Sequence, residues 1–469
     1  MVFSNLIFLY LFLPLNIILY YLSKNKTYRN LVLILFSLLF YAWGEPVWVF
    51  VLMFSVGVDY CNGRIIERSR GRLAAKLALA VSVGVNLSLL GLFKYSGFLV
   101  SSVNAALGLS LPVPQFILPI GISFYSFQAI SYVVDVYRGD VAAQKSYYKL
   151  LMYVSLYPQL VAGPIVRYSQ IAVEIDERRT TSQDVSLGLT RMLCGLTKKV
   201  VIANVAGKLL EGFTGAPVGT LSVAGAWFGM LLFGLQIYYD FSGYSDMAIG
   251  LGQVFGFHYQ ENFNYPYVSR SVTEFWRRWH ISLSSFFRDY VYIPLGGNRR
   301  RQYLNLFIVW FLTGLWHGPS WNFVLWGLYF GVFIALERLF LSKVLGRIPL
   351  VFSHLYLLVV ALLGWTLFYF EDFGRLRGYL GVMFGLSGAP LWETKVGLVI
   401  LNNLLWLIVA LLFCLPVVPH VKALIARYAS HRQMVLVRLC ETVMNFALLF
   451  LCTSLLVGQS FNPFLYFRF

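Results

Sequence analysis

The sequence predicts an all-α protein that crosses a membrane many times. Of its 469 residues, 59% are hydrophobic and only 12% are charged, whereas ordinary soluble domains are about 25% charged. A mean hydropathy of +0.70 likewise requires that much of the surface face lipid. Because a membrane-crossing helix needs about 20 mostly apolar residues, the stretches free of Asp, Glu, Lys and Arg predict about eleven transmembrane helices, in one integral-membrane domain over residues 1–469.

The apolar stretches follow one another along the whole chain. Residues 1–22 have no basic segment and no small-residue cleavage site, so we interpret them as a retained helix and not as a signal peptide. Residues 30–58 contain a single charge, Glu45, and its neighbours Gly44 and Pro46 predict the turn of a helical hairpin. The longest charge-free stretches are residues 1–23, 95–134, 212–239, 302–336, 348–370, 396–421 and 442–467, and residues 77–93 and 150–166 are shorter ones.

The net charge of +17 comes from 37 Lys and Arg against 20 Asp and Glu. In a soluble protein this balance would suggest nucleic acid, but here the basic residues collect between apolar stretches, and we expect membrane lipids and no nucleic acid as partners. By the positive-inside rule these connections face the cytoplasm. The basic groups lie within residues 24–29, 64–76, 277–301 and 422–438.

Helix-breaking residues interrupt three of the apolar stretches. Such breaks at membrane depth are tolerated where other protein covers the freed backbone, so we expect a re-entrant segment and an enclosed cavity. Five scattered cysteines without a CxxC pair give no indication of a metal or redox site, and we expect no metal and no bound cofactor. The breaks lie at Pro112, Pro114, Pro119 and Gly121, at Pro158 with Gly163 and Pro164, and at Gly314 with Gly318 and Pro319.

Asp240 and Asp246 bracket a short Ser/Gly-containing segment in an otherwise apolar region. A charged side chain at the centre of a membrane helix costs about 2.5–3.5 kcal/mol on insertion scales, so it has a partner or a function. Capping or interhelical hydrogen bonding is the simpler interpretation of both residues. Asp240 is also a candidate substrate-binding residue.

Residues 271–290 predict one amphipathic helix that begins at a capping box, Ser271 with Glu274. At about 100° per residue, its aromatic side chains form one stripe, its arginines lie opposite, and His280 lies on the border, which is typical of an interfacial helix. The arginines bind lipid phosphates or a phosphate-bearing substrate or carrier, and the spacing alone favours lipid. The candidates are Arg277, Arg278 and Arg288, with Asn298 in the following turn.

His317 is the only histidine in the charge-free stretch of residues 302–336. Removal from water disfavours a charged imidazole, and a neutral imidazole can act as a general base that activates a hydroxyl. Of the six histidines, only His280 and His317 combine aromatic neighbours with an adjacent backbone break. Interhelical hydrogen bonding is the alternative for either ring, and a two-histidine metal site would lack a third ligand.

Motifs spread over most of the chain resemble the membrane-bound O-acyltransferase family, and within it the bacterial branch that O-acetylates alginate, other exopolysaccharides and peptidoglycan. The family's signature histidine falls on His317 and its second motif histidine on His280. Residues 371–441 match nothing that we can place. The motifs are residues 118–125, 135–139, 162–167, 239–248, 274–283, 314–318 and 462–467.

The resemblance implies a ring of tilted helices that encloses a tunnel through the bacterial inner membrane. An acyl group, with acetyl as the expected one, would pass from a cytoplasmic thioester, either acetyl-CoA or a carrier-linked donor, to a hydroxyl reached from the outer side. His317 would activate this hydroxyl, and His280 would position or polarise the donor. We further expect a separate exported acetyltransferase to complete delivery to the polysaccharide.

Two other functions are consistent with the same features. A transporter or lipid flippase also has broken helices and intramembrane polar residues, although its inverted repeats are not apparent in this sequence. An O-acyltransferase that acts on a protein or lipid acceptor, with a longer acyl chain, would share the motifs.

Overall fold

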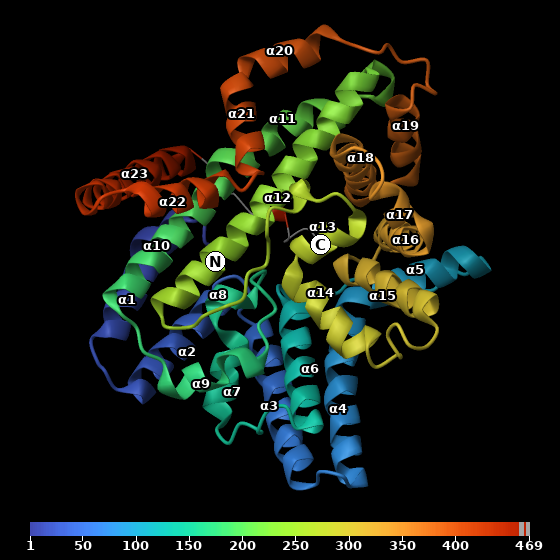
Figure 1. Cartoon of the computed structure of the whole chain (residues 1–469). Coiled ribbons are helices and arrows are strands. Elements are labelled where there is room, and N and C mark those ends of the chain that lie inside the picture. The colour runs from blue at the N-terminus through green and yellow to red at the C-terminus, as the bar shows by residue number, and fades with distance from the viewer. Residues whose placement is uncertain (459–463, 466–469) are drawn as a thin grey trace.

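The computed structural model describes residues 1–458 and 464–465, and these form helices with no strand among them (Figure 1). The all-α class is therefore as predicted. Of the motif at residues 462–467, Asn462, Pro463, Tyr466 and Phe467 lie outside the described residues.

The α-helices of the first half are α1 (Leu13–Tyr21), α2 (Lys26–Ala42), α3 (Trp48–Arg68), α4 (Leu73–Leu90), α5 (Ser96–Leu107), α6 (Ile122–Arg138), α7 (Tyr147–Ser155), α8 (Tyr157–Leu160), α9 (Tyr168–Glu177), α10 (Ser182–Thr197), α11 (Asn204–Thr214) and α12 (Val223–Val254). Those of the second half are α13 (Val272–Arg278), α14 (Ile281–Phe287), α15 (Gln302–His317), α16 (Trp321–Leu336), α17 (Ser342–Leu345), α18 (Leu350–Tyr369), α19 (Phe373–Met383), α20 (Thr394–Asn402), α21 (Leu404–Phe413), α22 (Val417–Tyr428) and α23 (His431–Val457).

Short π-helical and 3-10 segments extend or join several of these helices. A π-helical turn widens the backbone locally and is frequent at functional sites. The π-helical segments are η1 (Phe8–Phe12), η2 (Gly91–Tyr95), η3 (Lys198–Ala203), η6 (Arg288–Tyr292) and η7 (Glu337–Leu341), and the 3-10 segments are η4 (Val218–Thr220) and η5 (Pro266–Val268).

The helical hairpin predicted around Glu45 is present. α2 begins at the N-cap Asn25, whose side chain accepts a hydrogen bond from the backbone N–H of Tyr28 over 3.2 Å, which satisfies one of the free N–H groups of the first turn. The helix ends at Ala42, and α3 starts at Trp48 after the predicted turn. In Figure 1 α3, α4 and α6 stand side by side at one edge of the molecule, and they contact one another.

The described residues form five helical segments that are long and apolar enough to cross a membrane. α20 and α21 together make a sixth if their 74° bend belongs to a single crossing. The chain is therefore a multi-pass membrane protein, and the count of eleven crossings stays a prediction. The five segments are Trp48–Arg68, Leu73–Leu107, Trp321–Leu345, Leu350–Tyr369 and Arg432–Val457.

Two of the longest charge-free stretches are divided by the predicted helix breakers, which explains why they do not form simple crossings. In the first, α5 ends at Leu107, residues 109–120 are not helical, and α6 begins after Gly121 in a left-handed conformation (φ 78°). In the second, the chain reverses at Gly318 and Pro319, so that α15 and α16 pack against each other.

Glycines allow the closest helix contacts. A Cβ atom on Gly314 of α15 would collide with the carbonyl of Phe323, and one on Gly327 of α16 would collide with the carbonyl of Trp310. Close backbone approach through small residues is a common packing mode of membrane helices. The pair therefore holds His317, at the end of α15, in a fixed relation to α16.

The 32-residue helix α12 runs obliquely through the middle of the molecule (Figure 1). At 1.5 Å per residue it is about 48 Å long, and it contacts α8, α10, α11, α18 and α19. Gly188 and Gly195 of α10 lie against the carbonyls of Gly250 and Gly243 of α12, again a contact that a larger side chain would prevent.

The single helix predicted over residues 271–290 is wrong. Ser271 does cap the first turn, since its hydroxyl accepts from the N–H of Glu274 over 3.1 Å, but α13 ends at Arg278. His280 is in the left-handed region (φ 44°), and α14 starts at Ile281. A calculation at 100° per residue cannot anticipate such a break, because it assumes one continuous helix axis.

The aromatic side chains of residues 271–290 were predicted to face the apolar layer of the membrane, but they lie inside the protein. Trp276, Trp279 and Phe286 are buried inside the protein, where Trp276 packs on Trp310 and Phe330 with ring centroids 5.1 and 5.0 Å apart. The rings therefore anchor the segment in the helical core rather than in lipid.

Candidate functional site

His317 is the last residue of α15 and is buried, with 7% of its surface exposed. Three aromatic rings surround its imidazole. The centroid distances are 4.8 Å to Trp326, 5.0 Å to Trp316 and 5.3 Å to Phe368, all in edge-to-face geometry. Such packing fixes the plane of the imidazole and keeps it out of bulk solvent.

His280 is held by hydrogen bonds behind its ring. Its Nδ1 lies 3.1 Å from Oδ1 of Asn262, which also accepts from the N–H and the hydroxyl of Ser282 over 3.2 and 2.9 Å. Asn262 Nδ2 donates to the hydroxyl of Ser245 over 3.0 Å, so Oδ1 is the acceptor that faces His280. We therefore assign the proton of the neutral ring to Nδ1 and the free electron pair to Nε2.

Nε2 of His280 is buried and has no hydrogen-bond partner among the described residues. A buried polar atom without a partner costs free energy, and so does the left-handed backbone of a residue other than glycine. Both features are typical of a residue whose position serves a ligand.

One cavity of about 550 Å³ joins the two histidines to the predicted arginines. Its inner wall is apolar, with Trp276, Leu306 and Trp310 among its residues. Trp316 links the histidines within the fold, with ring centroids 5.9 Å from His280 and 5.0 Å from His317. The predicted site residues that line this cavity are His280, His317, Arg277, Arg288 and Asn298.

The arginines of the cavity differ in how firmly they are already paired. Arg277 is exposed and makes no side-chain hydrogen bond or ion pair within residues 1–458 and 464–465. Arg288 is also exposed, but its Nε donates to Asp289 over 2.6 Å. Burial raises the pKa of the Asp289 carboxyl, but the hydrogen bonds and charges of Arg288 and Arg167 outweigh burial and hold this pKa below its ordinary value. Arg277 is consequently the arginine most available to an anionic ligand.

Sequence reasoning missed Arg338 and Tyr292, which line the same cavity. Arg338 donates to the hydroxyl of Tyr292 over 2.9 Å and to Oδ1 of Asn298 over 3.0 Å, and Tyr292 donates to Asn298 over 2.7 Å. The sequence did contain a signal for Arg338. The chain reverses at Gly318 between α15 and α16, so Arg338, which follows α16, lies at the same end of the helix pair as Arg301, which precedes α15.

Two predicted residues lie outside this cavity. Arg278 pairs with Glu274 on its own helix at 2.9 Å and donates to the carbonyl of Asn264. Asp240, buried in the middle of α12, forms an ion pair with Lys199 at 2.5 Å and accepts from the N–H of Leu465 over 2.7 Å. The interhelical pairing expected for Asp240 is thus what the structure contains.

A second, small cavity of about 20 Å³ lies against His317 and is lined by Asp240, Phe241 and Leu465 among others. His317 and Trp279 line both cavities. His317 therefore borders open space toward the arginines and also toward Asp240. The cavity toward Asp240 has room for about one water molecule.

Comparisons with known proteins show the family to which the chain belongs. Residues 138–344 match the membrane-bound O-acyltransferase (MBOAT) family, and this range contains all of the residues predicted for the site. The chain is 41% identical to a probable alginate O-acetylase of Pseudomonas putida over 84% of this chain and 82% of that protein. It is 37% identical to a probable alginate O-acetylase of Azotobacter vinelandii over the whole of both chains.

A third relative acts on another polymer. The chain is 33% identical to the peptidoglycan O-acetyltransferase of Helicobacter pylori over 83% of this chain and 81% of that protein. Identity at this level over most of both chains is shared by proteins of one fold and one general chemistry. The chain therefore belongs to the membrane-bound O-acyltransferase family, in the branch of the alginate O-acetylases, and is an O-acyltransferase.

Proposed function

We propose that this protein transfers an acetyl group from a cytoplasmic thioester, acetyl-CoA or a carrier-linked donor, to a hydroxyl reached from the outer side of the membrane. The acetyl group is destined for an exopolysaccharide such as alginate or for another cell-envelope glycan. The observation that carries the proposal is the position of the buried His317 on the wall of the cavity that His280 and the arginines line, with a second, water-sized cavity on its side toward Asp240. The named relatives act on alginate and peptidoglycan, which supports a glycan acceptor.

In the proposed reaction His317 is the general base. The acceptor hydroxyl attacks the thioester carbonyl carbon while His317 takes the hydroxyl proton. The new C–O bond forms, the C–S bond breaks, and the leaving sulfur receives the proton from the imidazolium. A direct transfer of this kind needs one base and no nucleophilic Ser or Cys.

His280 positions the donor in this scheme. With the proton on Nδ1, held by Asn262, its Nε2 accepts a hydrogen bond from the bound donor. A neutral ring in this tautomer cannot donate to the thioester carbonyl from Nε2. The geometry therefore favours positioning of the donor over polarisation of its carbonyl.

The arginines of the cavity bind the anionic end of the donor. Arg277 and Arg338 lie along the same cavity as the histidines, and guanidinium groups bind phosphate through paired N–H donors. The apolar inner wall suits the uncharged thioester arm. Arg278, turned toward Glu274, is available to lipid headgroups at most.

The two cavities support a tunnel that crosses the bacterial inner membrane at His317. Arg299, Arg300 and Arg301 are exposed at the start of α15, and under the positive-inside rule they place the arginine-lined cavity on the cytoplasmic side. The acceptor then enters from the outer side. Helices too short to qualify as crossings on their own, joined end to end in bent pairs as α20 and α21 are, would complete the proposed eleven.

Because a glycan assembled outside the cell is much larger than the cavity beside Asp240, we propose that a separate exported acetyltransferase receives the acetyl group and delivers it. Detergent-solubilised protein should co-purify with such a partner from cells that make the acetylated polymer. Repeated purification without any exported acetyltransferase would contradict this part of the proposal.

The acceptor class is tested by comparing the envelope glycans of cells with and without the gene. Mass spectrometry should find acetyl esters on an exopolysaccharide or on peptidoglycan only when the gene is present, with the polymer itself made in equal amount. Unchanged glycan esters, together with a lost acyl group on a protein or lipid, would redirect the proposal to another acceptor.

A further inference from the structure

We propose that Lys94 and Tyr95 are positioning residues for His317, which they hold by capping the end of α15 with side-chain hydrogen-bond donors. The inference rests on the proposed role of His317 as the base. It assigns a function to a lysine that is buried at membrane depth and that the reaction scheme does not otherwise use.

The end of α15 needs such a cap. The last four carbonyls of an α-helix have no partner within the helix, and many helices solve this with a following glycine in the left-handed conformation. Gly318 is instead extended (φ −169°, ψ 156°), so the chain leaves the helix directly after His317.

Side chains from η2 take the place of the missing backbone cap. The hydroxyl of Tyr95 donates to the carbonyl of Leu315 over 2.8 Å. Nζ of Lys94 lies 2.6 Å from the carbonyl oxygen of Trp316 and 3.4 Å from that of His317. Two adjacent residues of one π-helical turn thus bind three consecutive carbonyls, and the last of the three belongs to His317 itself.

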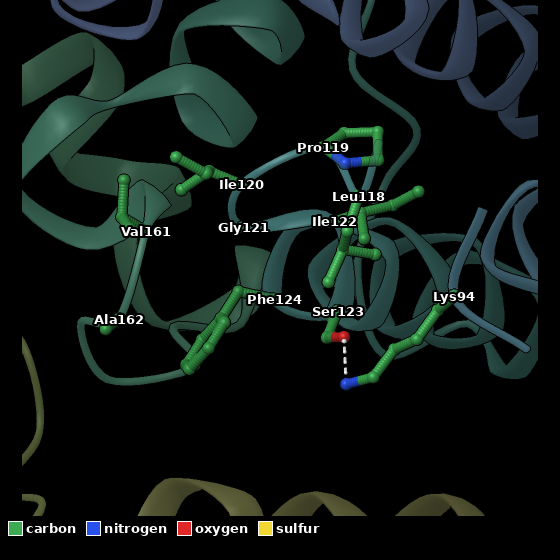
Figure 2. Close-up of a pocket in the computed structure, with 10 residues that line it drawn as sticks. All are labelled: Lys94, Leu118, Pro119, Ile120, Gly121, Ile122, Ser123, Phe124, Val161 and Ala162. Carbon is green, nitrogen blue, oxygen red and sulfur yellow. Dashed lines mark hydrogen bonds between the residues drawn. The ribbon is translucent and has the colours of Figure 1, made fainter. Parts of the chain in front are cut away.

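The ammonium group of Lys94 is fully committed to this task. It is 6% exposed, within the apolar segment Leu73–Leu107, and no carboxylate in residues 1–458 and 464–465 lies within 4.0 Å of it. Its third contact is the hydroxyl of Ser123 at 3.2 Å, shown in Figure 2. An ammonium group has three N–H donors, and a cation at the C-terminal end of a helix is stabilised by the helix dipole.

The hydrogen bond from Lys94 to Ser123 also links the end of α15 to His280. Ser123 stands at the start of α6, and the next residue, Phe124, packs on Trp316 and on His280 with ring centroids 5.4 and 6.5 Å apart. Lys94 therefore ties the end of α15 to the helix that supports the ring of His280. An ionisable residue that is costly to bury in a membrane is expected to have a function of this kind.

A cavity of about 100 Å³ beside Lys94, lined by Ser123, Phe124 and the loop around Gly121, provides room for a conservative replacement (Figure 2). Lys94→Arg keeps a cationic donor and should retain at least a third of the wild-type kcat. Lys94→Met keeps the length of the side chain without any donor and should lower kcat at least tenfold. Tyr95→Phe removes one hydroxyl only and should lower kcat about twofold to fivefold.

The experiment uses the full-length protein in lipid nanodiscs with acetyl-CoA and a soluble hydroxyl acceptor. Because Lys94 touches neither reactant, the donor KM of Lys94→Met should stay within twofold of wild type. Lys76→Met, an exposed lysine earlier on α4, is the matched control and should change nothing. Unchanged kcat in both Lys94→Met and Tyr95→Phe, or a rise in donor KM alone, would overturn the inference.

A second readout does not depend on the chemistry. In protein with ¹⁵N-labelled histidine, the imidazole signal that disappears in His317→Gln belongs to His317, and this signal should shift or broaden in Lys94→Met and Tyr95→Phe. An unmoved signal contradicts the positioning role whatever the activity shows. If instead the signal moves while His317→Ala proves fully active, the capping stands and the proposed role of His317 as base fails.

Discussion

At the scale of single residues, His280 joins a left-handed backbone (φ 44°) to a buried Nε2 atom with no partner among the described residues. Asparagine tolerates the left-handed conformation better than most residues, so His280→Asn should fold normally. Loss of the ring should lower acetyl transfer about 10²-fold, the cost of a misplaced reactant. Transfer assays on purified protein check this, with His258→Asn, an exposed histidine paired to Glu174, as the control that should keep wild-type activity.

The arginines of the cavity give a second residue-scale prediction. Arg277→Ala should raise the donor KM about tenfold, since a hydrogen bond to a charged group contributes about 1.5–3 kcal/mol. Arg288→Ala should raise it less, because Asp289 already binds that guanidinium. Arg278→Ala should leave donor KM unchanged. If the arginines bound only lipid, the donor KM would be the same as that of wild type in all three variants.

At the scale of elements, the α15–α16 pair depends on glycines where the two backbones meet. Gly327→Ala would place a methyl group against the carbonyl of Trp310, and overpacking of this kind costs about 1–3 kcal/mol. We expect a lower thermal midpoint and reduced transfer, because His317 moves with α15. Gly381→Ala in α19, where a Cβ meets nothing within 4 Å, should match wild type in both measurements. Equal midpoints for the two variants would contradict the packing described.

Elements that depend on local sequence signals could be predicted, and those that depend on contacts between distant residues could not. Composition predicts helices and breaks well, because apolar length and proline act locally, and the hairpin at Glu45 and the turn at Gly318 are confirmed. The left-handed turn at His280 was not predicted, because the amphipathic pattern of residues 271–290 continues across it and indicates one helix. The role of Lys94 could not be predicted either, because its partners at the end of α15 are more than two hundred residues away in the sequence.

The site also contains residues that the sequence predicts and residues whose role only the folded structure decides. His317, His280, Arg277, Arg288 and Asn298 line one cavity. The family motifs contain His317, His280 and Arg277, whereas Arg288 and Asn298 were predicted from the amphipathic pattern of residues 271–290 and the turn after it. Arg278 could not be told from Arg277 by spacing alone, since which of two neighbouring arginines turns toward Glu274 is decided by the folded helix.

At the scale of the whole molecule, the placement of basic residues predicts the orientation of the bundle. Under the positive-inside rule, Arg300 faces the cytoplasm and Glu45 the outside. A cysteine introduced at Glu45 in a cysteine-free background should react with a membrane-impermeant maleimide in intact spheroplasts, and one at Arg300 only after permeabilisation. Labelling in the opposite order would place the arginine-lined cavity on the acceptor side and would contradict a cytoplasmic donor.

The central claim is that one imidazole at the junction of two cavities performs the transfer. The most direct measurement is acetyl transfer by purified His317→Ala in nanodiscs, compared with wild type at equal folded concentration. We expect the rate to fall by about 10²–10⁴-fold, the usual contribution of a general base, with donor affinity unchanged. A variant that folds, binds the donor and transfers acetyl groups at the wild-type rate would contradict the account.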